Sequence, residues 1–279
     1  MLDTVVMYRE YNLFKIIQRG VIMSIKIYYF SGTGNSLAVA KKLKKYIIDE
    51  SDIHSITKFI NEKSVLVDTD ILGFVFPVYF MDIPDIVKEF INKLEFKTKP
   101  YIFAVATCNI TCGKSLININ KCLTKKKQFL SSVFIINMPG NAVVTPPEIE
   151  IERLNNYENK VAEISVSINN REVSEFEGKG NFKTNVISYL LKKIGKKLYL
   201  TPEKVSTTSD CRGCGICEKV CPLNNIKVVN NKPQWGNNCS TCLACFHWCP
   251  KKAVIAGKML NKREQYHNRE VCIEDISNF

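Results

Sequence analysis

The sequence predicts a doubly wound α/β domain followed by a smaller, cysteine-rich α+β domain. Three observations carry this prediction. Apolar strand-like runs alternate with amphipathic helical stretches over residues 25–168, a glycine-rich turn joins the first strand to the first helix at 31–36, and matching cysteine runs lie at 211–222 and 239–250. Alternation of strand and helix implies a parallel sheet covered on both faces. With 279 residues, of which 46% are hydrophobic, the chain is long enough for about two domains.

The first strand and helix are the clearest of the α/β elements. IKIYYF at 25–30 is apolar and β-rich, and LAVAKKLKKYII after it has apolar residues at helical spacing. Pro84 suits the first turn of a later helix. The further elements expected are strands at 53–59, 71–76, 101–106 and 133–137, and helices from Pro84 to about Leu94, at 114–123 and within 148–168.

The remaining segments are expected to extend or link these domains. VISYLLKKIGKKLY at 186–199 predicts a short amphipathic helix closed at Gly195, and Asn230-Asn231 predicts a hairpin turn. The boundaries expected are an N-terminal extension at 1–23, the α/β domain at 24–168, a linker at 169–204, the cysteine-rich domain at 205–257 and a tail at 258–279.

The turn SGTGNS connects a strand to a helix N-terminus, where backbone N–H groups and the helix dipole bind phosphate. No lysine follows it, so it is not GxxxxGK[ST], and it does not match GxGxxG either. Hydroxyl groups and an asparagine amide without cations suit one terminal phosphate, as in FMN. At Gly34 a Cβ is expected to block the phosphate and to penalise positive φ. The alternative is a plain capped βα turn. The candidate phosphate residues are Ser31, Gly32, Thr33, Gly34, Asn35 and Ser36.

Two more loops are expected at the carboxyl ends of the strands, where parallel sheets bind ligands. PVYFM at 77–81 offers two aromatic faces for an isoalloxazine ring. The alternative for both aromatic residues is ordinary packing within the loop. TCNITCG at 107–113 offers backbone amides and small polar groups for the ring edge. The candidate residues in these loops are Pro77, Val78, Tyr79, Phe80, Thr107, Cys108 and Asn109.

Each cysteine run follows C-x2-C-x2-C-x3-C-P, a spacing typical of [4Fe–4S] clusters. In two-cluster proteins the fourth cysteine of each run ligates the other cluster. Disulfides would need an oxidising compartment, and zinc sites use two CxxC pairs rather than a triple run. The first cluster is therefore assigned to Cys211, Cys214, Cys217 and Cys249, and the second to Cys239, Cys242, Cys245 and Cys221.

The other cysteines and the histidines carry no motif. Cys108, Cys112, Cys122 and Cys272 fall outside the runs and are expected to be free thiols in a reducing cytoplasm. The expected place for each histidine is the surface. These residues are His54, His247 and His267.

The formal charge of +12 does not predict nucleic-acid binding. Each cluster and a flavin phosphate would add about −2, the lysines are scattered, and no stretch interleaves bases with aromatics. The lysines are expected mainly on solvated helix faces, and the alternative is a docking face for acidic redox partners. Residues 1–23 lack the features of a signal peptide, and the longest apolar run, within 71–81, is too short to span a membrane.

Residues 24–168 resemble a flavodoxin domain, and residues 205–257 resemble a bacterial two-cluster ferredoxin. Together they resemble the flavodoxin–ferredoxin fusion family, the so-called ferrodoxins, in SGTGNS, FPVYFMDIP, NMPGN at 137–141, Trp235 and CLACFHWCP. QYHNREV at 265–271 resembles the C-terminal segment of that family, with His267, Asn268 and Arg269 where His-His-Pro is expected. The resemblance implies a sheet of order 2-1-3-4-5, FMN and two [4Fe–4S] clusters.

The leading hypothesis is an electron carrier of anaerobic redox metabolism in which electrons pass between the clusters and FMN, with no catalytic acid, base or nucleophile. Two alternatives stay open. One is an FMN/iron–sulfur oxidoreductase that reduces a small acceptor. The other is a ferredoxin whose flavodoxin-like half has become a docking module without flavin.

Overall fold

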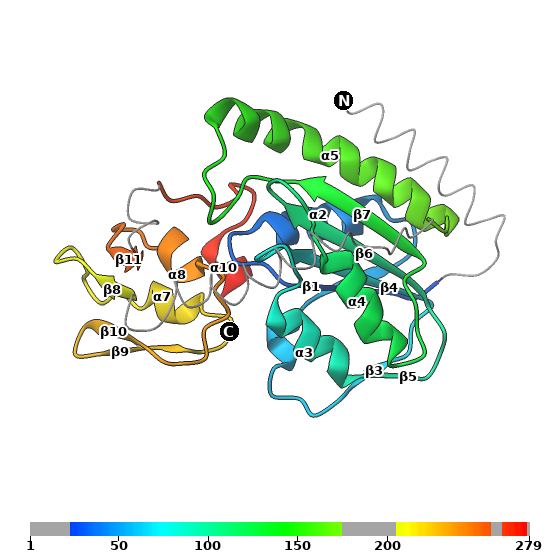
Figure 1. Ribbon diagram of the computed structural model, residues 1–279, viewed down its shortest axis with the longest axis horizontal. Helices are drawn as coiled ribbons and strands as arrows, with labels where there is room; N and C mark the ends of the chain where they lie inside the picture. The colour runs from blue at the N-terminus through cyan, green and yellow to red at the C-terminus, as the bar shows by residue number, and fades with distance from the viewer. Residues whose placement is uncertain (1–22, 175–204, 258–263, 278–279) are drawn as a thin grey trace.

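The computed structural model describes residues 23–174, 205–257 and 264–277. We call these three parts the α/β half, the cysteine-rich half and the C-terminal segment. In Figure 1 the C-terminal segment, in red, lies between the two halves. The expected extension, most of the expected linker and its helix at 186–199 lie outside the described residues.

A five-stranded parallel sheet forms the centre of the α/β half, and the expected order 2-1-3-4-5 is confirmed. The two central strands are buried almost throughout because helices cover both faces of the sheet. In spatial order the strands are β2 (Ser51–Ser55), β1 (Ile25–Tyr29), β4 (Ile71–Pro77), β6 (Tyr101–Cys108) and β7 (Ser132–Asn137).

Two pairs of helices cover the sheet (Figure 1). On one face α2 (Asn35–Tyr46) packs against α5 (Pro147–Asn170), and on the other α3 (Asp85–Lys93) packs against α4 (Ser115–Thr124). Each helix presents an apolar stripe to the sheet and charged residues to water, as the spacing in the sequence predicts.

The segment expected as one strand at 53–59 is divided. The strand ends at Ser55, whose side chain accepts a hydrogen bond from the backbone N–H of Thr57 and caps a short 3-10 helix, η1 (Ile56–Phe59). A local side-chain bond of this kind competes with the sheet ladder. Two strands that the sequence did not predict, β3 (Val65–Val67) and β5 (Leu94–Phe96), pair in parallel beside the main sheet.

The cysteine-rich half is built from two small antiparallel pairs and two short helices. The predicted hairpin turn is present, since Asn230 and Asn231 both adopt positive φ, as a two-residue turn requires. The elements are β8 (Val205–Thr207) with β11 (Val254–Ala256), β9 (Ile226–Val229) with β10 (Lys232–Trp235), α7 (Ile216–Lys219) and α8 (Ala244–His247).

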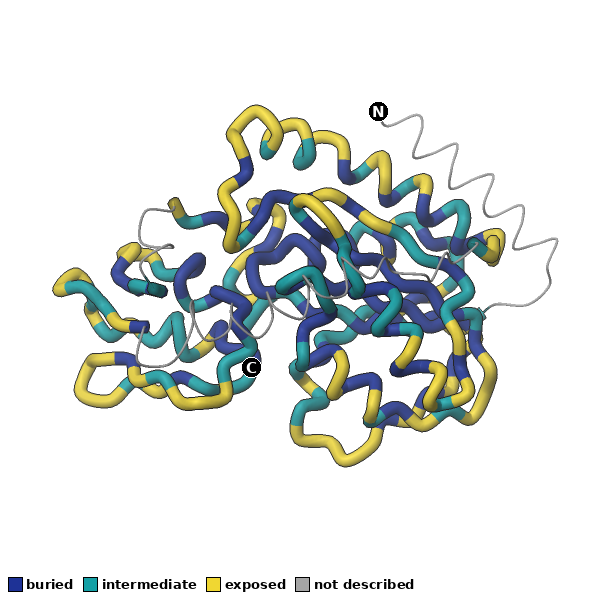
Figure 2. Tube along the Cα trace, viewed as in Figure 1, coloured by how far each residue is buried: buried dark blue, intermediate teal, exposed yellow. Residues whose placement is uncertain are grey.

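The main apolar core extends from the sheet into the cysteine-rich half, which also has a small core of its own formed by Val205, Leu243, Phe246, Val254 and Ala256. Val220, Cys242, Ala244 and Trp248 of the cysteine-rich half and Val271 of the C-terminal segment belong to the same buried cluster as the sheet. Figure 2 shows the buried trace continuing from the sheet into the cysteine-rich half. The halves are therefore not independent in packing. Within the described ranges, no helix has the length and apolar character needed to cross a bilayer.

The centre of the sheet has one position that admits only glycine. A Cβ built on Gly73 of β4 would overlap the ring of Phe103, its partner on β6. We expect Gly73→Ala to destabilise the fold by about 1–3 kcal/mol, because overpacking forces the strands apart. Denaturant unfolding would measure this. In a Phe103→Leu background the same change should cost less, and equal costs in both backgrounds would contradict the steric explanation.

Candidate functional site

A cavity of about 520 Å³ opens where the carboxyl ends of the strands meet the cysteine-rich half. This volume lies within the range of small-molecule sites. The loops that follow β1, β4, β6 and β7 form most of its wall, and Thr241 and Leu243 of the cysteine-rich half close it. Every candidate flavin residue named above lines it except Gly34. Their role as flavin ligands stays a prediction.

The loop at 31–36 has the local structure of an anion site. It ends at the N-terminus of α2, whose first N–H groups have no carbonyl partner inside the helix. Gly34 adopts φ +93, as expected, and its N–H donates to Ser31 Oγ at 3.1 Å. A Cβ there would lie 3.0 Å from Val271 and 3.1 Å from Asn268. A side chain at this position would therefore also press on the C-terminal segment, and the expected clash with phosphate stays a prediction.

Two side chains of this loop are already engaged. Ser36 and Thr107 share a buried hydrogen bond of 2.8 Å. The amide of Asn35, expected as a phosphate donor, donates instead to the carbonyl of Pro139 at 2.9 Å. Backbone N–H groups and the hydroxyls of Ser31 and Thr33 are thus the donors best placed for an anion.

The turn at 79–82 carries the two aromatic residues. Tyr79 and Asp82 exchange backbone hydrogen bonds, and Phe80 and Met81 between them adopt φ 51 and 59. Positive φ at two bulky residues is strained by about 1–3 kcal/mol each and is typical of ligand sites. The chain approaches this turn closely at Gly113, where a Cβ would overlap Met81.

Tyr79 is 8% exposed, and its hydroxyl makes no hydrogen bond of ordinary geometry among the described residues, although the nearby side chain of Asn141 acts to lower its pKa. Burial raises the pKa of Tyr79 well above its usual 10, and a thiolate at Cys242 would raise it further. The hydroxyl therefore remains a donor. A buried donor beside an open cavity fits a polar ligand, since an unpaired buried group is costly.

Asn109 links two loops that form the remaining wall of the cavity. Its side chain accepts from Thr145 and Arg153 and donates to the carbonyl of Val143. Gly140 lies so close that a Cβ there would be 2.6 Å from the Asn109 amide. Burial, and then the charge of Cys112, raise the pKa of the neighbouring Cys108 to about 11, so its thiol stays protonated at neutral pH.

The cysteines of the two runs fall into two groups. Cys211, Cys214, Cys217 and Cys249 line one small cavity, so the fourth cysteine of the second run joins the first three of the first. Burial and the neighbouring thiolates raise the pKa of Cys217 to about 11. Iron binding to these sulfurs therefore releases protons.

The second group consists of Cys239, Cys242, Cys245 and Cys221, whose sulfurs interact electrostatically with one another. Burial, and then the charge of Cys221, raise the pKa of Cys242 to about 12. Both groups suit four-thiolate clusters. Among the described residues, no three His, Cys, Asp or Glu side chains are placed to hold one single metal ion. All twelve cysteines are described, and none forms a disulfide.

Trp235 lies against the second group. Its indole N–H is buried without a conventional acceptor, and Trp235 and Cys245 both pack against the small core of this half. The indole lowers the pKa of Cys245 against the larger rise caused by burial. An N–H aimed at a ligand sulfur is a common means of tuning a cluster.

Two protein-family models match the chain, one in the α/β half and one in the cysteine-rich half. The family model described as a flavodoxin domain matches residues 26–173, more than half of the chain. The chain belongs to the flavodoxin family. A second family model, a 4Fe-4S binding domain, matches residues 206–227, which include the first cysteine run. The chain thus joins a flavodoxin domain to a 4Fe-4S domain, a combination that supports an electron-transfer protein with a flavin and an iron–sulfur centre.

Solved structures similar to the chain include a flavodoxin and an oxidoreductase. Two-electron reduced flavodoxin from Megasphaera elsdenii is 15% identical, with a TM-score of 0.34 over 51% of this chain and 98% of that chain. Rubredoxin oxygen:oxidoreductase from Desulfovibrio gigas is 12% identical, with a TM-score of 0.31 over 52% of this chain and 36% of that chain. A search of curated proteins finds no match.

Sequence reasoning missed part of this flavodoxin-family site. The NMPGN turn was noted only as a resemblance, yet residues 138–143 form a wall of the cavity. His247 is 1% exposed rather than at the surface. His267 is exposed as expected, and its ring stacks on Trp248 with the centroids 4.2 Å apart. The signal available was the position of His247 between cluster cysteines. Cavity-lining residues not predicted are Met81, Ile110, Thr111, Met138, Pro139, Gly140, Asn141, Ala142, Val143, Thr241 and Leu243.

The ligand grouping predicts the effect of single cysteine changes. Cys211→Ser should lower iron from about eight atoms per chain, the two-cluster content, and should destabilise both groups, because the runs cross. Cys272→Ser is the control, since Cys272 is exposed and lies outside the runs. Iron and sulfide analysis of the anaerobically reconstituted variants measures both. Unchanged iron in Cys211→Ser would refute the grouping.

Trp235→Phe should lower the reduction potential of the cluster held by Cys245, because an N–H donor near a ligand sulfur stabilises the more negative reduced state. The ring that packs in the small core is kept. EPR-monitored redox titration would separate this cluster from the other, which should not change. Equal potentials in the parent and the variant would show that the indole only packs.

Proposed function

We propose that this chain passes electrons between two [4Fe–4S] clusters and a bound FMN, in the anaerobic redox metabolism of the cytoplasm. The observation that supports this is the composition of the cavity wall. Thr241 and Leu243 lie between cluster cysteines and also line the candidate flavin cavity. A cluster held by Cys239, Cys242 and Cys245 would therefore adjoin a flavin in that cavity.

The domain limits of this proposal follow the sequence expectation. The FMN-binding domain would comprise 24–168 and the two-cluster domain 205–257, with a linker at 169–204, an extension at 1–23 and a tail at 258–279. FMN would supply one- and two-electron transfer, and the clusters would supply single-electron transfer.

The protein's own contribution is binding and orientation. The N-terminus of α2, with the hydroxyls of Ser31 and Thr33, would hold the terminal phosphate. The 79–82 turn would pack its aromatic residues against the ring system, and the unpaired hydroxyl of Tyr79 would find a partner. Backbone groups at 107–109 would face the polar edge of the ring. Nothing in this scheme requires a general acid or base.

The partners would be redox proteins with acidic surfaces. Cys214 is exposed, so a partner can approach the first cysteine group directly. Arg212 and Lys251 line the cavity of that group, and Lys252 beside them is exposed. An acidic partner would complement these cations, and its association rate would fall with salt.

A second candidate, reduction of a small apolar acceptor, is favoured by the rim of the flavin cavity. Ile110 and Val143 line the cavity and are 75% and 58% exposed. Exposed apolar side chains at the mouth of a site suit a hydrophobic ligand. Steady-state turnover with a panel of quinones would detect this activity, and electron transfer to proteins alone would exclude it.

Anaerobic reconstitution with quantified iron, sulfide and flavin tests the main proposal. We expect about eight irons per chain and one FMN. A redox titration of the same sample should resolve the flavin and both clusters. A flavin-free protein with full iron would instead favour a docking role for the α/β half. About four irons per chain would contradict the second cluster.

A further inference from the structure

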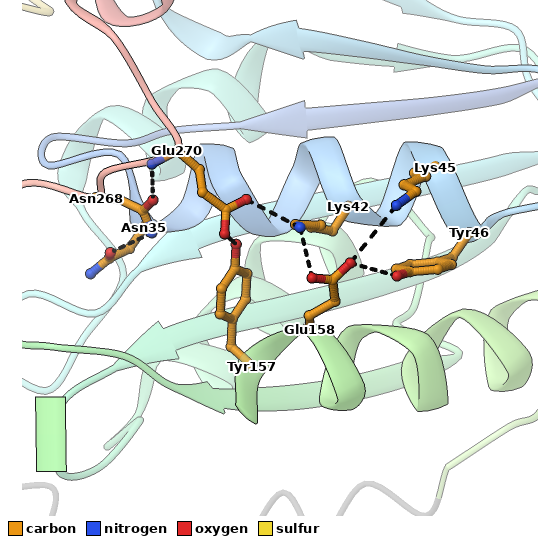
Figure 3. Close-up of polar contacts among 8 residues, drawn as sticks. All are labelled: Asn35, Lys42, Lys45, Tyr46, Tyr157, Glu158, Asn268 and Glu270. Carbon is orange, nitrogen blue, oxygen red and sulfur yellow. Dashed lines mark hydrogen bonds and ion pairs between the residues drawn. The ribbon is translucent and has the colours of Figure 1, made fainter. Parts of the chain in front are cut away.

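The C-terminal segment contacts the candidate phosphate loop from outside the flavodoxin domain. Asn35 Oδ1 accepts hydrogen bonds from the hydroxyl of Tyr266 at 2.6 Å and from the amide of Asn268 at 3.3 Å. The backbone N–H of Asn268 also donates to the carbonyl of Thr33 at 2.8 Å. Figure 3 shows Asn268 beside Asn35 at the start of α2. All four residues are less than 9% exposed.

The cysteine-rich half holds the preceding peptide of the same loop. The indole N–H of Trp248 donates to the carbonyl of Gly32 at 2.9 Å in a buried contact. The C=O and N–H of a trans peptide point in opposite directions. Fixing the carbonyl of Gly32 on Trp248 therefore directs the N–H of Thr33 away from α8. Thr33 lines the cavity, so this contact presents a donor to an anion there.

Glu270 anchors the segment to the helices (Figure 3). Its carboxylate accepts from the hydroxyl of Tyr157 at 2.6 Å and pairs with Lys42 at 3.2 Å. Lys42 also pairs with Glu158 of α5 at 2.8 Å. The contacts tie the segment to α2 and α5 together, so its position relative to the phosphate loop is fixed.

The same segment is bonded to α8 and the residues after it, a stretch that carries the predicted cluster ligands Cys245 and Cys249. Gln265 Nε2 donates to the carbonyls of Phe246 and Cys249 at 2.6 and 2.9 Å. The backbone N–H of Tyr266 donates to Nδ1 of His247 at 3.0 Å. Nε2 of His247 therefore carries the proton and donates to the carbonyl of Asn141, on the cavity wall, at 2.8 Å. Whatever fixes α8 also fixes two walls of the cavity.

We propose that Trp248, Tyr266 and Asn268 are positioning residues that hold the 31–36 loop in its phosphate-binding conformation, and that FMN affinity consequently depends on the iron–sulfur clusters. The dependence arises because cluster ligation by Cys245 and Cys249 fixes α8, and α8 fixes the C-terminal segment. This inference rests on the proposed function, since it concerns the same flavin.

Tyr266→Phe and Trp248→Phe test the positioning role in the full, reconstituted chain. Each removes one donor and keeps an aromatic ring. We expect each to weaken FMN binding by about tenfold, as loss of one buried hydrogen bond would, with iron content and cluster absorbance unchanged. Quenching of flavin fluorescence gives the dissociation constant. Cys272→Ser, an exposed change in the same segment, is the control and should bind FMN like the parent.

Removal of iron tests the dependence on the clusters. Chelation should weaken FMN binding at least tenfold in the parent, but much less in the double variant Trp248→Phe/Tyr266→Phe, where the connection is already broken. FMN affinity that is unaffected by chelation would overturn the dependence. Parent-like affinity in both single variants, with iron retained, would overturn the positioning role. If Trp248→Phe loses iron, the FMN affinity of the nearly isosteric Tyr266→Phe variant tests the positioning role in its place. A parent that binds no FMN would refute the proposed function instead.

Discussion

The contact of α8 with the loops of the sheet is the constraint on which the rest of the structure depends. His247 and Trp248, adjacent in sequence, donate to the carbonyls of Asn141 and Gly32 on two sides of one cavity. Asn141 in turn donates to the carbonyl of Cys242 at 3.2 Å. Buried bonds of this kind are costly to leave unmade. The cavity and the second cysteine group therefore share a single set of contacts.

This shared set suits a protein that moves electrons within one chain. A docking interface between separate domains is usually polar and modest, so that relative motion is the default. Here the main apolar core extends from the sheet into the cysteine-rich half and includes Cys242, a predicted cluster ligand. The packing fixes the distance between the two candidate cofactor sites instead of leaving it to a linker.

The sequence predicted the elements with strong periodicity and the sites with fixed spacing. The helices on both faces and the Asn230-Asn231 turn followed from patterns within short windows of the chain, whereas the strand order followed from the family resemblance. The contacts between the halves did not, because nothing local to Trp248 indicates that its partner is Gly32, which is 216 residues away. For the same reason His247 was expected at the surface, and the close approach of Val271 to Gly34 was not predicted.

Asn268 in the C-terminal segment departs from the pattern of the family that the sequence resembles, and its contacts give the departure a physical reason. His-His-Pro was expected at 267–269, and the residue found at the middle position is Asn268. It is 1% exposed, and its side chain both donates to Asn35 and accepts from the backbone N–H of Glu270 at 3.0 Å. An amide can donate and accept from adjacent atoms, which a single imidazole nitrogen cannot do in one tautomer. The substitution therefore falls on the residue that joins the phosphate loop to the Glu270 anchor, where the chemistry of the side chain decides how firmly that loop is held.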